Sequence, residues 1–194
     1  MLLSGFPPFS TATGSKKGLA QIKQLKKNLF DSLEGSDKGR VDKDGSKQRT
    51  INAILALAEA NPTPNSATSG LASGTWDLVW TTEDEIHLFR KKGLLGCACR
   101  AVLQTTEQSE RRLENIIEFD QNSALRIVSK LTPEATGPRV YFTWEDARVI
   151  YKGFSLPFPS FFFVRNAYYD NVYLDKELRC VKDIRGNYLV VRRV

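Results

Sequence analysis

Two segments near the N-terminus have the apolar spacing of helices. Residues 16–33 place apolar side chains three or four positions apart, which predicts one stripe of an amphipathic helix. The stripe consists of Leu19, Ile22, Leu25, Leu29 and Leu33. A second helix is predicted near 47–60, and the prolines of the next four residues, 61–64, end it, because a residue before proline avoids helical geometry.

From Gly74 onward the apolar period changes to two. Alternation of apolar and polar side chains in short runs is typical of strands with one buried face, and we count about eight of them. They lie near residues 74–80, 97–105, 113–119, 125–131, 139–145, 148–152, 177–181 and 187–194. This pattern predicts a mainly β fold, either an antiparallel sandwich or a barrel. A closed eight-stranded barrel has room inside for side chains or one small ligand.

Residues 154–164, with the sequence FSLPFPSFFFV, hold five phenylalanines, two prolines and no charge. Phe158 and the run Phe161, Phe162 and Phe163 permit two interpretations. They form a lid that closes one end of a barrel, or they form an exposed apolar patch that contacts a membrane or a partner. Lys152 and Arg165 flank the stretch and suit an anionic surface.

The net charge of +6 is concentrated at the N-terminus. Residues 1–30 contain five lysines and no acid, so the rest of the chain has 28 − 5 = 23 basic against 22 acidic residues. Nucleic-acid-binding domains carry their excess positive charge on the folded body, so we expect no nucleic-acid partner. No apolar run approaches the ~18–20 residues that span a bilayer. Residues 1–15 are acid-free and rich in small and hydroxyl residues, which predicts a disordered leader or the remnant of a transit peptide.

The residue types that carry catalysis or bind metal are sparse. The chain has one histidine, three cysteines, no nucleophile elbow and no phosphate-binding glycine loop. We therefore expect no enzyme activity, no cofactor and no metal site.

Two motifs resemble a known family. The segment SGTWDLVWTTE (73–83) is similar to the lipocalin-type Gly-x-Trp strand that opens the domain of plastid lipid-associated proteins, also called PAP or plastid fibrillins. The segment DNVYLDKELRCVKDIRGNYLVVRR (170–193) resembles the closing motif of that family, and EANPTP (59–64) resembles its lead-in. The resemblance covers residues 16–194, divided into a helical lead-in (16–60) and a β-barrel (74–194). The ending is nearer to the thylakoid-associated branch.

The resemblance implies an eight-stranded, lipocalin-like barrel in a chloroplast or another plastid, associated with thylakoids or plastoglobules. It also implies binding or organisation of prenyl lipids, carotenoids or fatty acids, in support of membrane maintenance and photoprotection. Two other functions stay open. The protein could be a structural one that coats lipid surfaces without an internal ligand, or an accessory partner of an isoprenoid-pathway enzyme.

The same resemblance assigns roles to individual residues. In lipocalins an arginine late in the last strand closes the barrel base over the Gly-x-Trp indole, and here Arg193 is the candidate to cover Trp76. Three aromatics on the inward pattern, Trp80, Phe142 and Trp144, either line a ligand cavity or fill the core. Asp175 and Arg179 lie four residues apart, which predicts one strand face and either a rim ion pair or a site for a ligand head group.

Overall fold

The computed structural model describes residues 16–158 and 167–194. Phe161, Phe162, Phe163 and the predicted leader at 1–15 lie outside these residues. The elements are α1 (Lys16–Ser32), α2 (Ser46–Glu59), η2 (Gly70–Ala72), β1 (Gly74–Thr81), α3 (Asp84–Lys92), β2 (Cys99–Glu107), β3 (Arg112–Phe119), β4 (Ser123–Pro133), β5 (Arg139–Tyr151), β6 (Phe154–Pro157), β7 (Ala167–Leu174), β8 (Leu178–Asp183) and β9 (Tyr188–Arg193).

All nine described strands belong to one antiparallel sheet, in the order β4-β3-β2-β1-β9-β8-β7-β5-β6. An additional pairing of β4 with β5 returns the sheet to its start, so eight strands form a ring and β6 lies outside it along β5. The predicted mainly β, antiparallel fold with two preceding helices is confirmed. The predicted strand list is wrong in part, because 139–151 is one strand and because β6, β7 and the helix α3 were not predicted.

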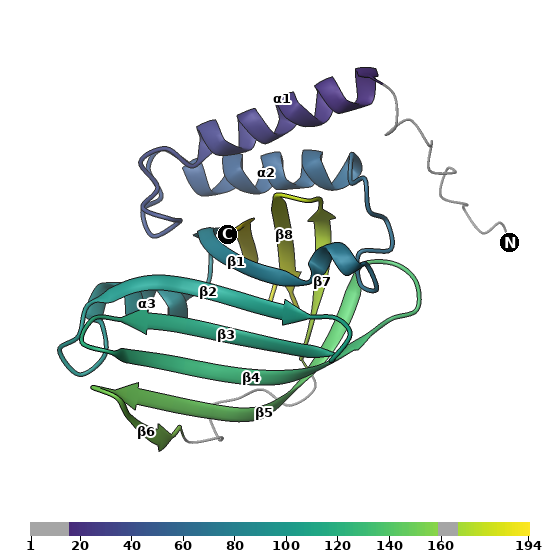
Figure 1. The fold of residues 1–194 in the computed structure, drawn as a ribbon. Coiled ribbons are helices and arrows are strands. Elements are labelled where there is room, and N and C mark those ends of the chain that lie inside the picture. The colour runs from purple at the N-terminus through teal and green to yellow at the C-terminus, as the bar shows by residue number, and fades with distance from the viewer. Residues whose placement is uncertain (1–15, 159–166) are drawn as a thin grey trace, which may run out of the picture.

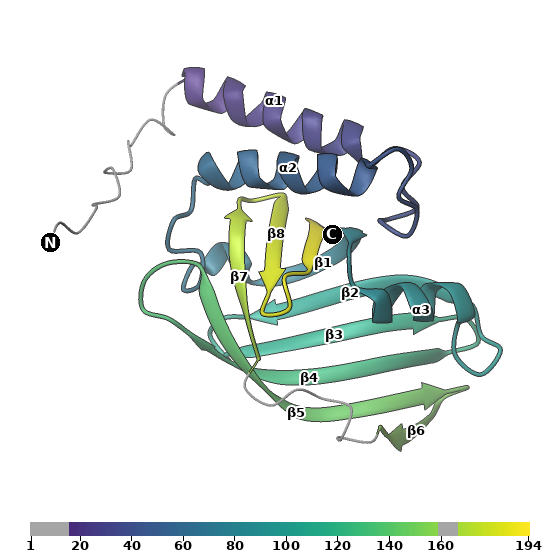
Figure 2. The same cartoon turned by 180° about the vertical axis from the view of Figure 1, so that it is seen from behind.

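The two N-terminal helices stack on each other and cover the outer side of the sheet at β7, β8 and β1 (Figures 1 and 2). Ile22 and Leu29 of α1 and Ile54 and Leu57 of α2 are buried in this layer. Leu19, at the start of the predicted stripe, is 60% exposed. Among the described residues, none of the helices is both long and apolar enough to pass through a bilayer.

The hydrophobic residues form two separate clusters, one on each face of the sheet. The inner cluster lies inside the ring and includes Trp76, Leu78, Leu113, Leu131 and Val191. The outer cluster lies between the sheet and the two N-terminal helices. It includes Trp80, Tyr173, Leu178, Cys180 and Val190 together with the helix residues. The outer faces of β8 and β9 are apolar under the helices, and their inner faces carry Val181, Leu189 and Val191 beside two arginines. Alternation alone therefore does not tell which face is the interior.

Trp80 corrects a prediction. The spacing of Trp76, Leu78 and Trp80 predicts one shared face, but the pairing of β1 with β9 shifts register between Leu78 and Trp80. This irregularity adds a residue on one side of the ladder, so the alternation reverses. Trp80 therefore packs under the helices in the outer cluster and does not line the interior with Phe142 and Trp144.

β1 and β9, the first and last strands in chain order, pair with each other, and Trp76 and Arg193 are direct neighbours in this ladder. The Arg193 guanidinium lies over the Trp76 ring, 4.2 Å from its centroid. Its nitrogens donate to three backbone carbonyls, those of Leu71 (2.5 Å), Ser73 (2.7 Å) and Lys176 (2.7 Å). This side chain therefore ties β9 to η2 and to the turn before β8.

Gly74 makes room for that arginine. Its φ is +128°, a backbone conformation that L side chains rarely adopt, and a Cβ there would lie 2.2 Å from Arg193 Nη1. The glycine of the Gly-x-Trp motif is thus required twice, by its backbone conformation and by the guanidinium packed against it.

We predict that Gly74→Ala lowers the free energy of unfolding by roughly 2–4 kcal/mol, because it strains the backbone and displaces Arg193 from its carbonyls. Urea unfolding measures the change. Gly186→Ala is the matched control, since Gly186 also has a positive φ (+83°) but has no atom within 4 Å of the new Cβ. Equal losses in the two variants would show that the contact with Arg193 contributes nothing.

Candidate functional site

A fully buried arginine lies inside the ring. Arg179 of β8 is 1% exposed, and its guanidinium reaches across β9 and β1 to β2. There Nη1 donates to Thr106 Oγ1 (3.2 Å) and Nη2 donates to Gln104 Oε1. Gln104 in turn donates to Asn115 Oδ1 of β3 (2.7 Å). A polar chain therefore crosses the interior from β8 to β3.

Arg179 also lies over Trp76, at 5.1 Å from the ring centroid. Trp76 is thus contacted by two guanidinium groups, those of Arg179 and Arg193. The indole face stabilises a cation, but the two cations repel each other. Burial lowers the pKa of Arg179, and the nearby charge of Arg193 lowers it further.

Arg179 has no acidic partner. No ion pair within 16–158 and 167–194 includes it, and the sequence of the remaining residues, 1–15 and 159–166, contains no Asp or Glu. Buried charges in proteins are normally paired with an opposite charge, since removing an ion from water costs several kcal/mol. Among the described residues, this interior positive charge is contacted by neutral groups and by no acid.

Three buried polar groups of the interior have unused hydrogen-bonding capacity. They are Arg179 Nε, the Oδ1 and Nδ2 of Asn171, and the Oγ of Ser129. Asn171 and Ser129 are both 0% exposed. Such atoms are uncommon in folded proteins, and each one needs an explanation.

An aromatic wall lies beside this polar region. Phe142 packs edge-on against Trp144, with ring centroids 5.4 Å apart, and at a tilt against Tyr169, at 5.9 Å. Phe142 and Trp144 are half-buried. Phe142 belongs to the inner cluster, and Trp144 lies two residues further along the same face of β5.

The predicted rim pair of Asp175 and Arg179 is wrong. β7 ends at Leu174 and β8 begins at Leu178, so the turn between them breaks the alternation that would place the two side chains on one face. Asp175 instead accepts hydrogen bonds from Tyr173 (2.5 Å) and from the backbone amides of Glu177 and Leu178, and it pairs with Lys26 of α1 (2.5 Å). Although burial opposes it, these bonds hold the pKa of Asp175 below its usual value.

The phenylalanine-rich stretch divides into two parts. Phe158 is half-buried and packs against the inner cluster, and its amide donates to Ala147 O (2.8 Å). Upstream, Phe154 and Leu156 of β6 are 77% and 59% exposed. The predicted lid or membrane residues Phe161, Phe162 and Phe163 lie outside the described residues.

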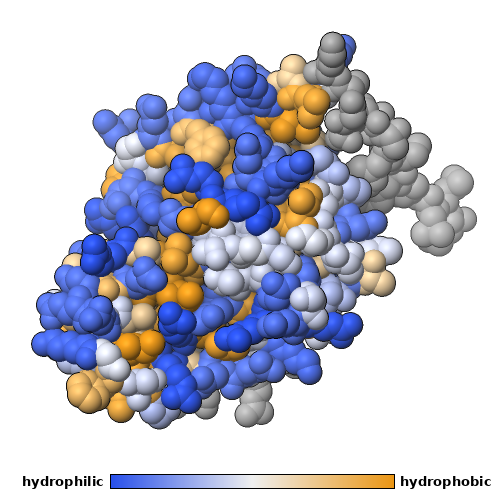
Figure 3. Space-filling view, in the orientation of Figure 1, coloured by the Kyte–Doolittle hydropathy of each residue, from blue (hydrophilic) through white to orange (hydrophobic). Residues whose placement is uncertain are grey.

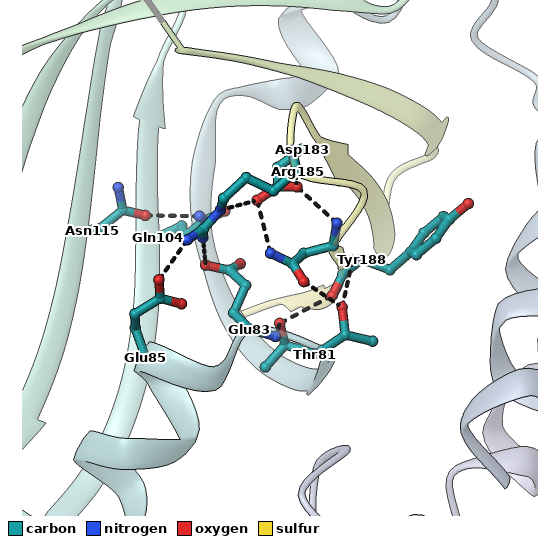
Figure 4. Close-up of polar contacts among 10 residues, drawn as sticks. Thr81, Glu83, Glu85, Gln104, Asn115, Asp183, Arg185 and Tyr188 are labelled. Atoms are coloured by element: carbon teal, nitrogen blue, oxygen red, sulfur yellow. Dashed lines mark hydrogen bonds and ion pairs between the residues drawn. The ribbon is translucent and has the colours of Figure 1, made fainter. Parts of the chain in front are cut away.

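A second polar cluster surrounds the turn from β8 to β9 (Figure 4). Arg185 contacts Glu85 of α3 (2.5 Å), Asp183 (3.2 Å) and, more distantly, Glu83 (3.9 Å). Burial raises the pKa of Glu83 to about 7, and the charge of Asp183 adds to this effect, while Arg185 opposes it. The cluster joins α3 to the end of the ring.

The sequence of residues 23–192 matches the PAP_fibrillin family. The chain belongs to this family. The match extends from α1 to β9 and confirms the family that the two motifs predicted. It contains every described site residue discussed above except Arg193, which follows its last residue.

Three relatives of this PAP_fibrillin protein have informative names. "Probable plastid-lipid-associated protein 11, chloroplastic" of Arabidopsis thaliana is 34% identical over 173 residues, which are 88% of this chain and 79% of that protein. "Chromoplast-specific carotenoid-associated protein, chromoplastic" of Cucumis sativus is 29% identical over 66% of this chain and 40% of its own length. "Plastid-lipid-associated protein, chloroplastic" of Citrus unshiu is 29% identical over 54% of this chain and 33% of its own length.

All three names refer to chloroplasts or chromoplasts, which supports a plastid location for this PAP_fibrillin protein. No solved structure matches the chain.

The raised pKa of Glu83 predicts a stability that falls as pH rises. The folded state holds the Glu83 proton up to about pH 7, whereas the unfolded carboxyl loses it near its ordinary value of 4.5, so stability declines between these two values. Glu83→Gln removes this effect. We expect the variant to be more stable than the parent by roughly 1–3 kcal/mol at pH 8 and nearly equal to it at pH 5.

Denaturant unfolding at both pH values measures the difference. Glu85→Gln is the matched control with the opposite sign. Burial raises the pKa of Glu85, but the hydrogen bond from Arg185, a backbone hydrogen bond and the charge of Arg185 together lower it below its usual value. That variant should be less stable than the parent at pH 8. A Glu83→Gln variant that loses stability at pH 8 would contradict the assignment.

Proposed function

We propose that this protein binds a hydrophobic molecule inside its ring of strands and organises it at a thylakoid membrane or plastoglobule. The molecule belongs to the prenyl lipids, carotenoids or fatty acids, and its retention supports membrane maintenance and photoprotection. We interpret the ring as a lipocalin-like barrel whose base Arg193 closes over Trp76.

The observation that supports this function best is the aromatic wall of Phe142 and Trp144. Both side chains are half-buried and lie two residues apart on the inner face of β5. Aromatic side chains that line the inside of a strand ring are typical of sites for small apolar ligands. Phe158, which packs against the inner cluster, is suited to act as a lid over the same region.

A specific observation favours the second candidate function, a protein that coats lipid surfaces. Two large apolar side chains, Phe154 and Leu156, are exposed on β6, and the exposed Lys152 lies over the ring of Tyr151, the ladder partner of Phe154. In Figure 3 apolar side chains interrupt the hydrophilic surface at the lower edge, where Figure 1 places β6. Exposed apolar side chains beside a cation are suited to an anionic lipid surface.

The internal ligand can be tested with retinol, a neutral isoprenoid whose emission rises when it leaves water. We expect saturable binding by the parent protein and a loss of about tenfold or more in affinity in Trp144→Asp, because a charge replaces an apolar contact. Thr143→Asp is the control, since Thr143 is exposed on the outer face of the same strand. Retinol binding that Trp144→Asp leaves unchanged would exclude the aromatic wall as the site.

The lipid surface can be tested by flotation with vesicles that contain anionic plastid lipids. Replacing Phe154 and Leu156 together by Asp should reduce vesicle binding by about 100-fold or more, because burying each side chain contributes roughly 1.5–3 kcal/mol. Ser155→Asp adds one negative charge on the opposite side of the strand and removes no apolar side chain, so it should reduce binding much less. If the double variant floats as the parent does, β6 is not the contact surface.

A further inference from the structure

Arg179 has chemistry that the fold alone does not explain. A structural role would be to hold Trp76, but Arg193 already contacts that ring at a shorter distance and has three carbonyl partners. Arg179 is also destabilised by burial and by the charge of Arg193. An apolar side chain of similar length would fill the same space without this cost.

The other buried groups with unused hydrogen-bonding capacity, Asn171 and Ser129, lie on the inner faces of β7 and β4. Asn171 of β7 pairs with Val181 in the ladder, and Val181 lies two residues from Arg179 on the same face of β8. Tyr169 connects this region to the aromatic wall, because its hydroxyl lies near enough to Arg179 to interact with its charge while its ring packs against Phe142. Ser129 of β4 is the ladder partner of Trp144.

We propose that Arg179 binds the carboxylate of an acyl or isoprenoid acid whose apolar chain passes along Phe142 and Trp144. This inference rests on the proposed internal site and names its class of ligand. Arg179 Nε, left free by Thr106 and Gln104, donates to one carboxylate oxygen, and Asn171 Nδ2 donates to the acid as well. The carboxylate of the ligand thereby supplies the negative charge that is missing beside Arg179.

The charge in the site favours a carboxylate over a phosphate. A phosphate monoester carries close to two negative charges at neutral pH, whereas one carboxylate balances one guanidinium. The other cation nearby, Arg193, is partly exposed, so water screens its charge, and the carbonyls of Leu71, Ser73 and Lys176 hold its guanidinium in place. Arg179 together with neutral amide and hydroxyl groups therefore matches a single negative charge.

The experiment compares three probes with the same 18-carbon chain by calorimetric titration of the delipidated protein at pH 8: oleic acid, its methyl ester and oleyl phosphate. We expect the acid to bind about 10- to 100-fold more tightly than the ester, since a hydrogen bond to a charged group contributes roughly 1.5–3 kcal/mol. Arg179→Met should remove this preference and leave the affinity for the ester unchanged. Oleyl phosphate should bind more weakly than oleic acid.

Two further variants serve as a control for surface charge and as a second test of the carboxylate site. Arg126→Met removes an exposed cation from the outer face of β4 and should keep the preference for the acid. Asn171→Leu should reduce it severalfold, and this variant together with the probes on the parent protein decides the question if Arg179→Met does not fold. The proposed internal site fails if neither oleic acid nor its ester binds. The role of Arg179 alone fails if the ester binds as tightly as the acid, if Arg179→Met keeps the preference, or if the phosphate binds best.

Discussion

The contact between Trp76 and Arg193 is the interaction on which the remaining structure depends. It links β1 and β9, the first and last strands in chain order, and the ring of strands is complete only when these two strands pair. The cation also binds carbonyls of η2 and of the β7–β8 turn, so one side chain orders segments far apart in the sequence. Gly74 is a consequence of this contact, because any larger residue would occupy the space of the guanidinium.

In the closed ring, each face of the sheet packs in its own hydrophobic core. The inner face packs around Trp76, and the outer face at β1, β7, β8 and β9 packs under α1 and α2. The irregularity in β1 allows one short strand to give one tryptophan to each core. The helical lead-in is therefore part of the same folded unit, since without it Trp80 and Leu178 would be exposed.

This double packing explains which features could be predicted from the sequence. The two N-terminal helices and most strands follow from periodicity, because a helix or strand with one buried face shows its period directly. The face of Trp80 could not be predicted, since a bulge leaves no signal in the residue types. Alternation alone assigns Leu178 and Cys180 to the interior face, which leaves Arg179 for a rim. They are apolar because they face the helices, so the arginine between them points inward.

The buried arginine determines which interpretation of the interior is physically consistent. A ring whose interior only fills space would gain stability from an apolar residue at this position, because a buried cation without an acid lowers the free energy of unfolding. The position instead combines a positive charge, unused hydrogen-bonding groups on Asn171 and an adjacent aromatic wall. The first two features are polar and the third is apolar. A molecule with an anionic head and an apolar chain would contact all three favourably. Neutral carotenoids or prenyl lipids would contact the aromatic wall but leave the charge of Arg179 unpaired.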